Sequence, residues 1–457
     1  MPHFSQEITE RILDSVWNEH GSFVLLRCSL VSRAWLPRTR HHLFSTITLN
    51  LMGFENSLER LKLRLAQLID PDAYTFTPFV QRLELYFKHM PRGWEEPFFA
   101  FIRVLPKYTS LVAIKIGRWR SSELRKEFRL HPLLDMFAHI PKLSDLILGR
   151  GDFDSAADFL RILNACPTLT ALTIHEFYWP NAPSTSLDSP LSTAYPRAGA
   201  IHALRLEGDK IAYVLDSFLA AGVPPACTTV ELKNIHADAV PVIGRFLACL
   251  GDNLRFLGIG FEETYISLFD ESNIGHPDAV ARASTHLEFR SFLSANRDHT
   301  TVLFVDHVDL RKNTCLEGFR LYNIVYCYSH DVTPAEALPN IPHILRSLSS
   351  PSLVHVSLTC EPFQLDEVPL VPWEEIDDIL ATKTPRQFTL FVLPLLAYSH
   401  SEDSRDVAVG KMHTAIRERL PRLDALGMLE LPPRRLYDRI PRCTFHNSWH
   451  WGEDHDF

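Results

Sequence analysis

The chain has 457 residues, of which 46% are hydrophobic and 22% charged, a composition typical of a folded protein with a sizeable core. Its 46 basic and 55 acidic side chains give a net charge of −9, so no global field attracts nucleic acid or an anionic membrane. Glycine is scarce (18) and proline frequent (31), which disfavours the glycine-rich loops that bind phosphates. At roughly 150 residues per domain, the length predicts about three domains.

The eight cysteines are spread along the chain, and no CxxC pair is available for zinc or redox chemistry. The first residues, MPHFSQEITER, lack the apolar core of a secretory signal. The longest apolar stretch, residues 388–398, contains Pro394 and is too short to span a bilayer. We therefore expect a cytoplasmic or nuclear protein with no membrane partner.

Residues 5–44 predict three short helices. Ser5 can cap the first, and Glu7 complements its dipole. The pattern breaks at Gly21 and Ser22, and Pro37 either ends the second helix or starts the third. The apolar residues on one face of the first helix are Ile8, Ile12, Leu13 and Val16, and those of the second are Phe23, Leu26, Leu30 and Ala34. By pattern alone, this unit is equally compatible with a helical cap on the following domain.

The segment FSQEITERILDSV, followed by LLRCSLVSRAWLPRTRHHLFSTITL, resembles an F-box, and in particular the F-box-like proteins that are abundant in fungi. The matching positions are Phe4, Glu7, Ile8, Ile12 and Leu13, then Cys28, Ser29, Leu30, Val31, Ser32 and Trp35. The resemblance implies that the segment binds a Skp-type adaptor and, through it, a cullin scaffold. The implied adaptor-binding residues are Phe4, Glu7, Ile8, Ile12, Leu30, Val31 and Trp35.

One departure from the F-box pattern concerns its start. The family usually has Leu-Pro where this chain has Phe4 and Ser5. Proline is conformationally rigid, so its loss removes a rigid element of the adaptor contact. The departure predicts weaker adaptor binding than is usual in the family.

From residue 44 onward a second pattern recurs: apolar, two residues, apolar, one residue, apolar. Its copies are Phe44-Ile47-Leu49, Val80-Leu83-Leu85, Leu111-Ile114-Ile116, Leu143-Leu146-Leu148, Leu169-Leu172-Ile174, Ile201-Leu204-Leu206, Cys227-Val230-Leu232, Leu254-Leu257-Ile259, Leu316-Phe319-Leu321, Leu353-Val356-Leu358 and Leu423-Leu426-Met428, with a poorer copy at Gln387, Leu390 and Val392. Copies start about 26 to 37 residues apart, except between Leu254 and Leu316, where one unit is missing or disguised. Such a period predicts a solenoid of stacked units.

Prolines recur at a fixed place in several of these repeat units. Pro141, Pro167, Pro351 and Pro421 each stand two residues before a leading leucine and follow an apolar helical pattern. Because proline cannot continue a helix, this position predicts a helix end followed by a short strand.

The LxxLxL core resembles leucine-rich repeats. The Asn or Cys expected three residues after the last apolar position is replaced, for example by Gly151, Phe177 and Glu262, so we expect irregular repeats. The predicted fold class is α/β: a short helical F-box followed by a leucine-rich-repeat-like solenoid with a curved parallel sheet. A doubly wound α/β domain also alternates strands and helices and is the alternative.

In a parallel sheet of this kind, the residues between the core positions point to the open face. Their chemistry is mixed, with no single sign of charge, which suits a client protein better than a phosphate polymer. The candidate client-binding residues are Lys115, Asp145, Thr173, His175, Arg205, Glu207, Glu231, Lys233, Phe256, Arg320, Tyr322 and His355, and Gly117, Ile147, Gly258 and Ser357 occupy equivalent positions.

These patterns divide the chain into residues 1–45 (helical module), 46–431 (solenoid) and 432–457 (tail). Residues 178–199 are rich in proline and serine and predict a surface loop inside one repeat. Residues 262–313 are atypical of the repeat.

No nucleotide-binding, zinc-protease, hydrolase or EF-hand motif occurs. Cys443, His446, His450 and His455 have spacings that zinc could use, but no matched cysteine pair accompanies them, so we predict no metal or cofactor. Asp152 and Asp154 are best explained as helix caps, and Glu374, Glu375, Asp377 and Asp378 as first-turn acids of a helix. The basic residues Arg118, Arg120, Arg125, Lys126 and Arg129 are interleaved with Glu123 and Glu127, as on a solvated face.

The sequence therefore predicts a non-enzymatic interaction protein: the substrate-recruiting subunit of a cullin-based (SCF-type) ubiquitin ligase. The alternative from another class is a protein-interaction scaffold that keeps a degenerate F-box only as a folded cap. An enzyme that uses the C-terminal Cys and His residues is a third hypothesis and would require a bound metal.

Overall fold

The computed structural model describes residues 5–52, 57–69, 76–88, 95–117, 131–149, 156–176, 200–208, 210–220, 222, 226–261, 303–322, 341–363, 368–369, 371–383, 385–394 and 402–432. The chain forms two compact units, Met1–Ala226 and Cys227–Phe457. The division at residues 45 and 431 stays a prediction. Several predictions concern residues outside the described ranges: the loop 178–199, Asp152 and Asp154, the basic cluster 118–129, most of segment 262–313 and the tail from residue 433.

The first unit begins with two helices, α1 (Gln6–Cys28) and α2 (Leu36–Phe44). The predicted cap is confirmed, because the Ser5 hydroxyl accepts a hydrogen bond from the Ile8 backbone N–H at 3.4 Å. Pro37 starts α2. The predicted break at Gly21 and Ser22 is wrong, since α1 continues through both. One interior glycine costs a helix only about 1 kcal/mol, which a long helix can absorb.

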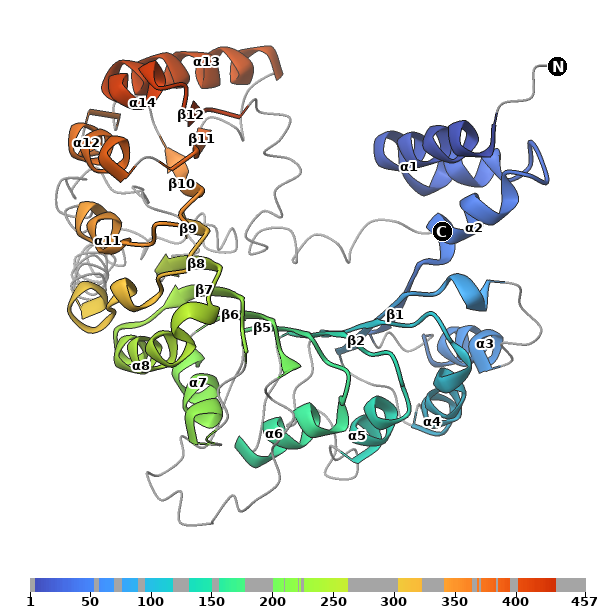
Figure 1. Ribbon diagram of the computed structural model, residues 1–457. Helices are drawn as coiled ribbons and strands as arrows, with labels where there is room; N and C mark the ends of the chain where they lie inside the picture. The colour runs from blue at the N-terminus through green and yellow to red at the C-terminus, as the bar shows by residue number, and fades with distance from the viewer. Residues whose placement is uncertain are drawn as a thin grey trace, which may run out of the picture. The chain divides into compact units, whose positions relative to one another are not determined.

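The rest of the first unit alternates strands and helices. In chain order they are β1 (Thr46–Met52), α3 (Ser57–Ile69), β2 (Arg82–Lys88), α4 (Glu95–Val104), β3 (Ala113–Gly117), α5 (His131–Ala138), β4 (Asp145–Gly149), α6 (Ala156–Ala165), β5 (Ala171–His175), β6 (Ala203–Glu207) and α7 (Ile211–Ala220). Neighbouring strands pair in parallel in the order β1 to β6. The helices lie on one side of these strands (Figure 1).

The strand register explains how this unit forms one core. Leu83, Ile114, Leu146 and Leu172 occupy equivalent places in β2 to β5, so the middle position of each LxxLxL copy lies in one row across the sheet. All four are essentially inaccessible to solvent. Each strand–helix step buries its apolar side against the next, as expected of stacked repeats.

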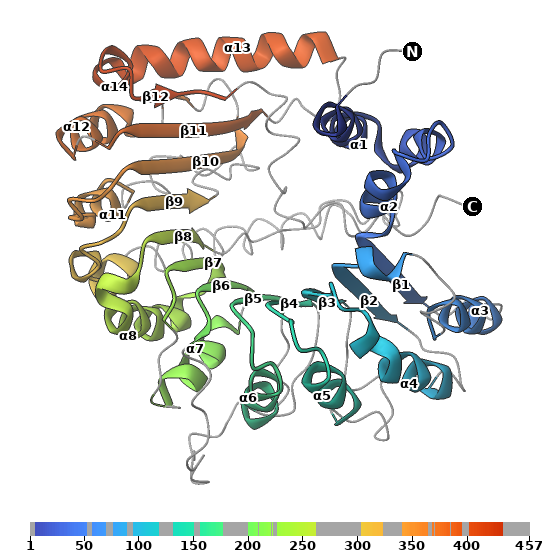
Figure 2. The same ribbon diagram turned by 45° about the vertical axis from the view of Figure 1, so that its right-hand side comes forward.

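The second unit is built in the same way. Its elements are β7 (Thr229–Ile235), α8 (Val240–Leu250), β8 (Phe256–Phe261), β9 (Gly318–Tyr322), α11 (Ile341–Ser347), β10 (His355–Phe363), α12 (Trp373–Lys383), β11 (Gln387–Pro394), α13 (Glu402–Arg419), α14 (Pro421–Ala425) and β12 (Leu429–Glu430). The strands again pair in parallel in sequence order. Figure 2 shows β9, β10 and β11 side by side, with α11 and α12 on one side of them.

The predicted α/β fold class with a parallel repeat sheet is confirmed. Within each unit, strand order follows chain order and helices lie on one side (Figure 1). A doubly wound domain reverses its strand order and places helices on both faces of the sheet. The alternative fold is therefore wrong.

Three of the four prolines end helices as predicted. Pro141, Pro167 and Pro351 lie in turns that follow α5, α6 and α11 and precede the next strand. Pro421 instead starts α14. The buried Asp377 carboxylate caps this helix by accepting hydrogen bonds from the backbone N–H groups of Arg422 (3.0 Å) and Leu423 (2.9 Å).

The capped helix α14 also shows that the last predicted repeat is wrong. Leu423 is in α14, Leu426 is exposed beyond it, and the strand consists of Leu429 and Glu430. The copy at Gln387 is displaced as well. Phe388 pairs with Val356 and Leu390 with Leu358, so the copy begins two residues earlier than predicted. A shift of two residues keeps the same strand face, so the apolar pattern could not distinguish the two registers.

The long interval between Leu254 and Leu316 places no described strand between β8 and β9, and its residues 262–302 lie outside the described residues. Strand β8 pairs directly with β9, with Leu257 opposite Phe319 and Ile259 opposite Leu321. The two strands flanking the interval are therefore direct neighbours in the sheet, and whether a repeat unit is missing or disguised stays a prediction.

A buried asparagine that precedes β9 donates hydrogen bonds to the C-terminal end of α8. Asn313 is fully buried, and its Nδ2 donates hydrogen bonds to the carbonyl oxygens of Leu247 (3.1 Å) and Gly251 (3.0 Å). The Leu247 carbonyl also accepts the Gly251 backbone N–H, and the Gly251 carbonyl accepts the Leu254 backbone N–H at 3.4 Å. Asn313 therefore adds a second hydrogen bond to each carbonyl and links the end of α8 to the segment that leads into β9.

We predict that Asn313→Ala lowers the free energy of unfolding by roughly 1–3 kcal/mol, because it removes two hydrogen bonds that each contribute about 0.5–1.5 kcal/mol. Urea denaturation followed by circular dichroism measures the change. Asn253→Ala is the matched control, since Asn253 is exposed, and it should change stability by less than about 0.5 kcal/mol. Equal effects of the two substitutions would contradict this role of Asn313.

Candidate functional site

The helical module presents apolar side chains to solvent. Six residues of α1 and the turn that follows it are exposed: Ile8, Ile12, Phe23, Leu26, Leu30 and Val31. We call this set the apolar stripe. Leu30 is 85% exposed and Val31 67%. Large apolar side chains grouped at a surface usually mark an interaction site.

The stripe follows one side of α1. At about 100° per residue, Ile8, Ile12, Phe23 and Leu26 fall within an arc of roughly 60°. Leu13 is fully buried on the other side of the helix. The prediction that Leu13 shares a face with Ile8 and Ile12 is therefore wrong. Phe23 and Leu26 were not predicted as site residues, because their alignment with Ile8 follows only when α1 is continuous through Gly21.

The remaining predicted adaptor residues lie in different surroundings. Glu7 is exposed in the first turn of α1. Trp35 is half-buried, and its carbonyl oxygen accepts the Thr39 backbone N–H at 3.0 Å, which starts α2. Phe4 lies outside the described residues. The structure thus leaves Ile8, Ile12, Leu30 and Val31 available to a partner and gives Trp35 a partly structural place.

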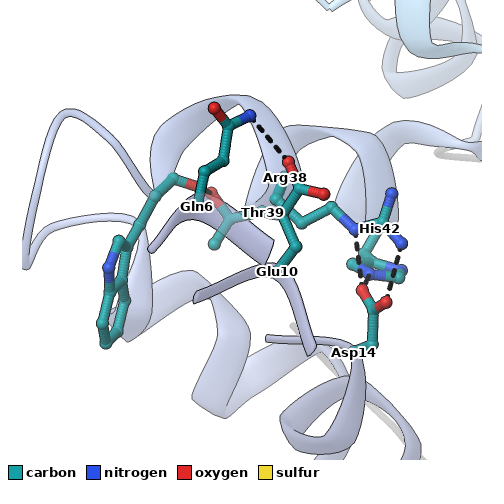
Figure 3. A network of polar contacts seen from close by, with 7 residues as sticks. Gln6, Glu10, Asp14, Arg38, Thr39 and His42 are labelled. Carbon is teal, nitrogen blue, oxygen red and sulfur yellow. Dashed lines mark hydrogen bonds and ion pairs between the residues drawn. The ribbon is translucent and has the colours of Figure 1, made fainter. Parts of the chain in front are cut away.

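A carboxylate clamp holds α2 against α1 (Figure 3). Asp14 of α1 accepts two hydrogen bonds from Arg38, from Nε at 2.7 Å and from Nη2 at 2.8 Å. The Nε2 of His42, one turn further along α2, lies 2.7 Å from the same carboxylate. Trp17 stacks on the His42 ring with centroids 5.6 Å apart. Bidentate carboxylate–guanidinium pairs are stronger and more directional than single hydrogen bonds, so the clamp fixes the angle at which α1 presents the stripe.

The clamp also sets the charge state of Asp14. Its hydrogen bonds from Arg38 lower the pKa of this carboxyl from 3.8 to about 2, against a smaller opposing effect of burial. No sequence pattern predicts this contact, because Asp14 and Arg38 are far apart along the chain and belong to no motif.

On the first unit, the candidate client-binding residues lie on the side of the strands opposite the LxxLxL core, which we call the strand face. Asp145 of β4 lies 3.5 Å from Arg82 of β2. Burial raises the pKa of Asp145, although Arg82 and Arg205 oppose the shift. His175 and the buried Glu207 are joined at 2.8 Å between Nδ1 and Oε2.

Two further contacts complete this surface. Lys115 Nζ lies 5.3 Å from the centroid of the Tyr86 ring, and the Tyr86 hydroxyl donates a hydrogen bond to Glu84 at 3.1 Å. Thr173 is buried and offers a partner little surface. Basic and acidic groups are thus paired with one another across the strand face of the first unit, in agreement with the mixed chemistry predicted.

The strand face of the second unit is organised around Tyr322. This ring lies over the glycines of β8, because a Cβ added to Gly258 would stand 3.0 Å from Tyr322 Cε2. Lys233 Nζ lies 4.4 Å from the ring centroid and Arg320 Cζ 5.6 Å from it. Burial raises the pKa of the Tyr322 hydroxyl, and Glu231 contributes in the same direction.

Beside this cluster, a polar chain runs across three strands. His355 Nε2 lies 3.0 Å from Thr389 Oγ1, which donates to Glu430 at 3.0 Å. Burial and the charge of Arg320 lower the pKa of His355. Phe256 fills the space above Gly318, where an added Cβ would stand 2.6 Å from its ring. These candidate residues are therefore brought together on one surface of the second unit.

Across the described residues, no group of three or more His, Cys, Asp or Glu side chains is arranged as metal ligands. Cys443, His446, His450 and His455 lie outside them. Among the helices that the structure describes, none combines the length and apolar character needed to cross a membrane. Burial raises the pKa of the Cys166 and Cys227 thiols to about 12, as expected of inert core cysteines.

Comparisons with known proteins leave the family open. No protein-family model matches the chain, and no curated protein matches it. Among solved structures, the chain is similar to one from the crystal structure of the Rad7 and Elc1 complex in yeast. The two are 12% identical, with a TM-score of 0.30, and the match covers 95% of this chain and 94% of the other. A likeness this weak carries no argument, so the F-box resemblance stays a prediction.

We predict that the clamp makes the helical module sensitive to acid. Because the pKa of Asp14 is lowered on folding, the stabilisation is complete above pH 3.8 and is lost as the pH falls towards about 2. Asp14→Asn should lower the free energy of unfolding by about 1 kcal/mol at pH 5, a value reduced for solvent screening, and by much less near pH 2. Thermal unfolding at both pH values measures the difference.

Glu10→Gln is the matched control on the same helix, since Glu10 makes an exposed hydrogen bond with Gln6. It should behave like the parent at both pH values. A constant difference between the parent and Asp14→Asn from pH 5 to pH 2 would contradict the clamp.

Proposed function

We propose that the chain is the substrate-recruiting subunit of a cullin-based (SCF-type) ubiquitin ligase. The helical module binds a Skp-type adaptor, and the strand faces of the repeat units bind a client protein. The chain performs no bond chemistry itself. It holds the client near the ligase's catalytic partner and so raises the effective concentration of the two reactants.

The observation that supports this function best is the apolar stripe. Its side chains would be buried in a stable monomer if their only role were packing. Instead, Leu13 and Leu25 of α1 are fully buried, and the side chains of the apolar stripe stay exposed to solvent. Burying a large apolar side chain that was fully exposed contributes about 1.5–3 kcal/mol, and these six side chains, which are 39% to 85% exposed, each contribute part of that value on association.

The test is a pull-down of a purified Skp-type adaptor by the full chain. Leu30→Asp places a charge at the most exposed position of the apolar stripe and should weaken binding by at least about tenfold, which corresponds to about 1.4 kcal/mol. Ile8→Asp should act in the same direction. The matched control is Leu63→Asp, because Leu63 is also an exposed leucine (63%, against 85% for Leu30) but lies on α3. No binding by the parent, or equal binding by all variants, would exclude the ligase function.

A second candidate is a non-ligase scaffold that keeps the helical module as a folded cap. Two contacts favour it: the Ser5 cap replaces the family's proline, and the Asp14 clamp ties α2 to α1. Under this hypothesis, a chain that lacks residues 1–45 keeps full activity in cells and the same client partners. Under the ligase hypothesis, this truncation abolishes client turnover while client binding persists.

A further inference from the structure

Arg320 of β9 has an unused donor on the strand face of the second unit. Its Nε is buried, and among the described residues it has no hydrogen-bond partner. Buried donors are almost always paired, because an unpaired one keeps the cost of its desolvation. An acceptor that reached Arg320 would remove this cost.

Two aromatic rings fix the position of this guanidinium. Arg320 Cζ lies 5.6 Å from the Tyr322 centroid and 5.8 Å from that of Phe391. Tyr322 is itself held over Gly258 and Gly260 of β8, where larger residues would collide with it. Contact with two rings restricts the guanidinium, and its planar set of donors matches the two oxygens of a carboxylate.

Neighbouring groups add a second unsatisfied atom and a second cation. Ser357 lies directly opposite Arg320 in the register of β10 and β9, is fully buried, and its Oγ has no partner among the described residues. The second cation is Lys233, whose Nζ lies 4.4 Å from the centroid of the Tyr322 ring. By contrast, His355, Thr389 and Glu430 are bonded to one another. Among the described residues of this strand face, the buried side-chain atoms without a hydrogen-bond partner are thus Arg320 Nε and Ser357 Oγ, while Asn313 Oδ1 and His413 Nε2 lack partners elsewhere in the unit.

The geometry points to a binding site for the side-chain carboxylate of an extended acidic peptide, centred on Arg320 and flanked by Tyr322, Phe391 and Lys233. The inference rests on the proposed function in one respect, since the peptide belongs to the recruited client. Strands about 4.8 Å apart make the face from β7 to β11 about 19 Å wide, which accommodates roughly six residues of extended chain. The apolar rings on either side would contact the peptide between its acidic positions.

The test uses a fluorescein-labelled decapeptide of alternating Asp and Ser, with acetylated and amidated ends, and the full-length chain. Fluorescence anisotropy should show binding that weakens as salt rises. The same peptide with Asn in place of Asp should bind at least about tenfold more weakly, because a neutral amide loses the charge-assisted hydrogen bonds. This comparison uses only the parent protein, so it does not depend on any variant folding.

Variants then locate the site. Arg320→Gln should lower affinity for the Asp peptide by about tenfold or more, and Arg320→Lys should have an intermediate effect, because it keeps the charge but loses the planar fork. The control is Arg255→Gln, since Arg255 is an exposed arginine of the same unit paired with Glu317 at 3.0 Å. This substitution should leave affinity unchanged. Thermal unfolding confirms that each variant is folded.

Three results would overturn the inference: equal binding of the Asp and Asn peptides, parental affinity in a folded Arg320→Gln variant, or tighter binding of a phosphoserine peptide than of the Asp peptide by more than about tenfold. Adaptor binding is measured separately in the pull-down. Arg320→Gln should retain it, so loss of the peptide site and failure of the ligase function give different results.

Discussion

The alignment of apolar side chains across parallel strands is the constraint on which each unit depends. A strand–helix step of about 30 residues cannot bury its own apolar side, and burial is achieved only when the next strand continues the row. Leu146 lies between Ile114 and Leu172, and Leu257 lies between Val230 and Phe319. Because strand side chains alternate, fixing these residues inward also fixes the outward residues, so core packing determines which side chains a partner can meet.

The outward residues are arranged by a second physical device, the pairing of rings with glycines. Phe256 covers Gly318, Tyr86 covers Gly117, and Tyr322 covers Gly258. A large ring can lie flat on a sheet only where a neighbouring strand offers no Cβ. Glycine is scarce in this chain, yet it occurs where these rings lie. The two tyrosine rings also hold cations: Lys115 lies on Tyr86, and Lys233 and Arg320 lie on Tyr322. The strand faces therefore carry charges in fixed positions rather than on freely moving side chains.

The repeat and its open face were predictable from the sequence because they rest on periodicity, which survives in a single chain. Contacts between segments far apart in the chain carry no such signal. Three hydrogen-bonded contacts join residues that no motif connects: Asn313 to the end of α8, Arg38 to Asp14, and the start of α14 to Asp377. The same limit explains the errors. Residues 421–425, where the repeat pattern predicts a strand, form the helix α14, whose start Asp377 caps. The apolar residues of β11 fit two strand registers equally well.

The direct pairing of β8 with β9 has a consequence for how such a protein can change in length. The connection between these strands is about twice as long as the others, yet the ladder from Leu257 to Phe319 keeps its register. Doubling a connection adds only about 0.6 kcal/mol of closure entropy, while the ladder is fixed by side-chain packing. Chain length and sheet geometry are thus independent variables at this step. Evolution, or an engineer, can insert sequence there, including a new binding element, without moving any strand from its neighbours.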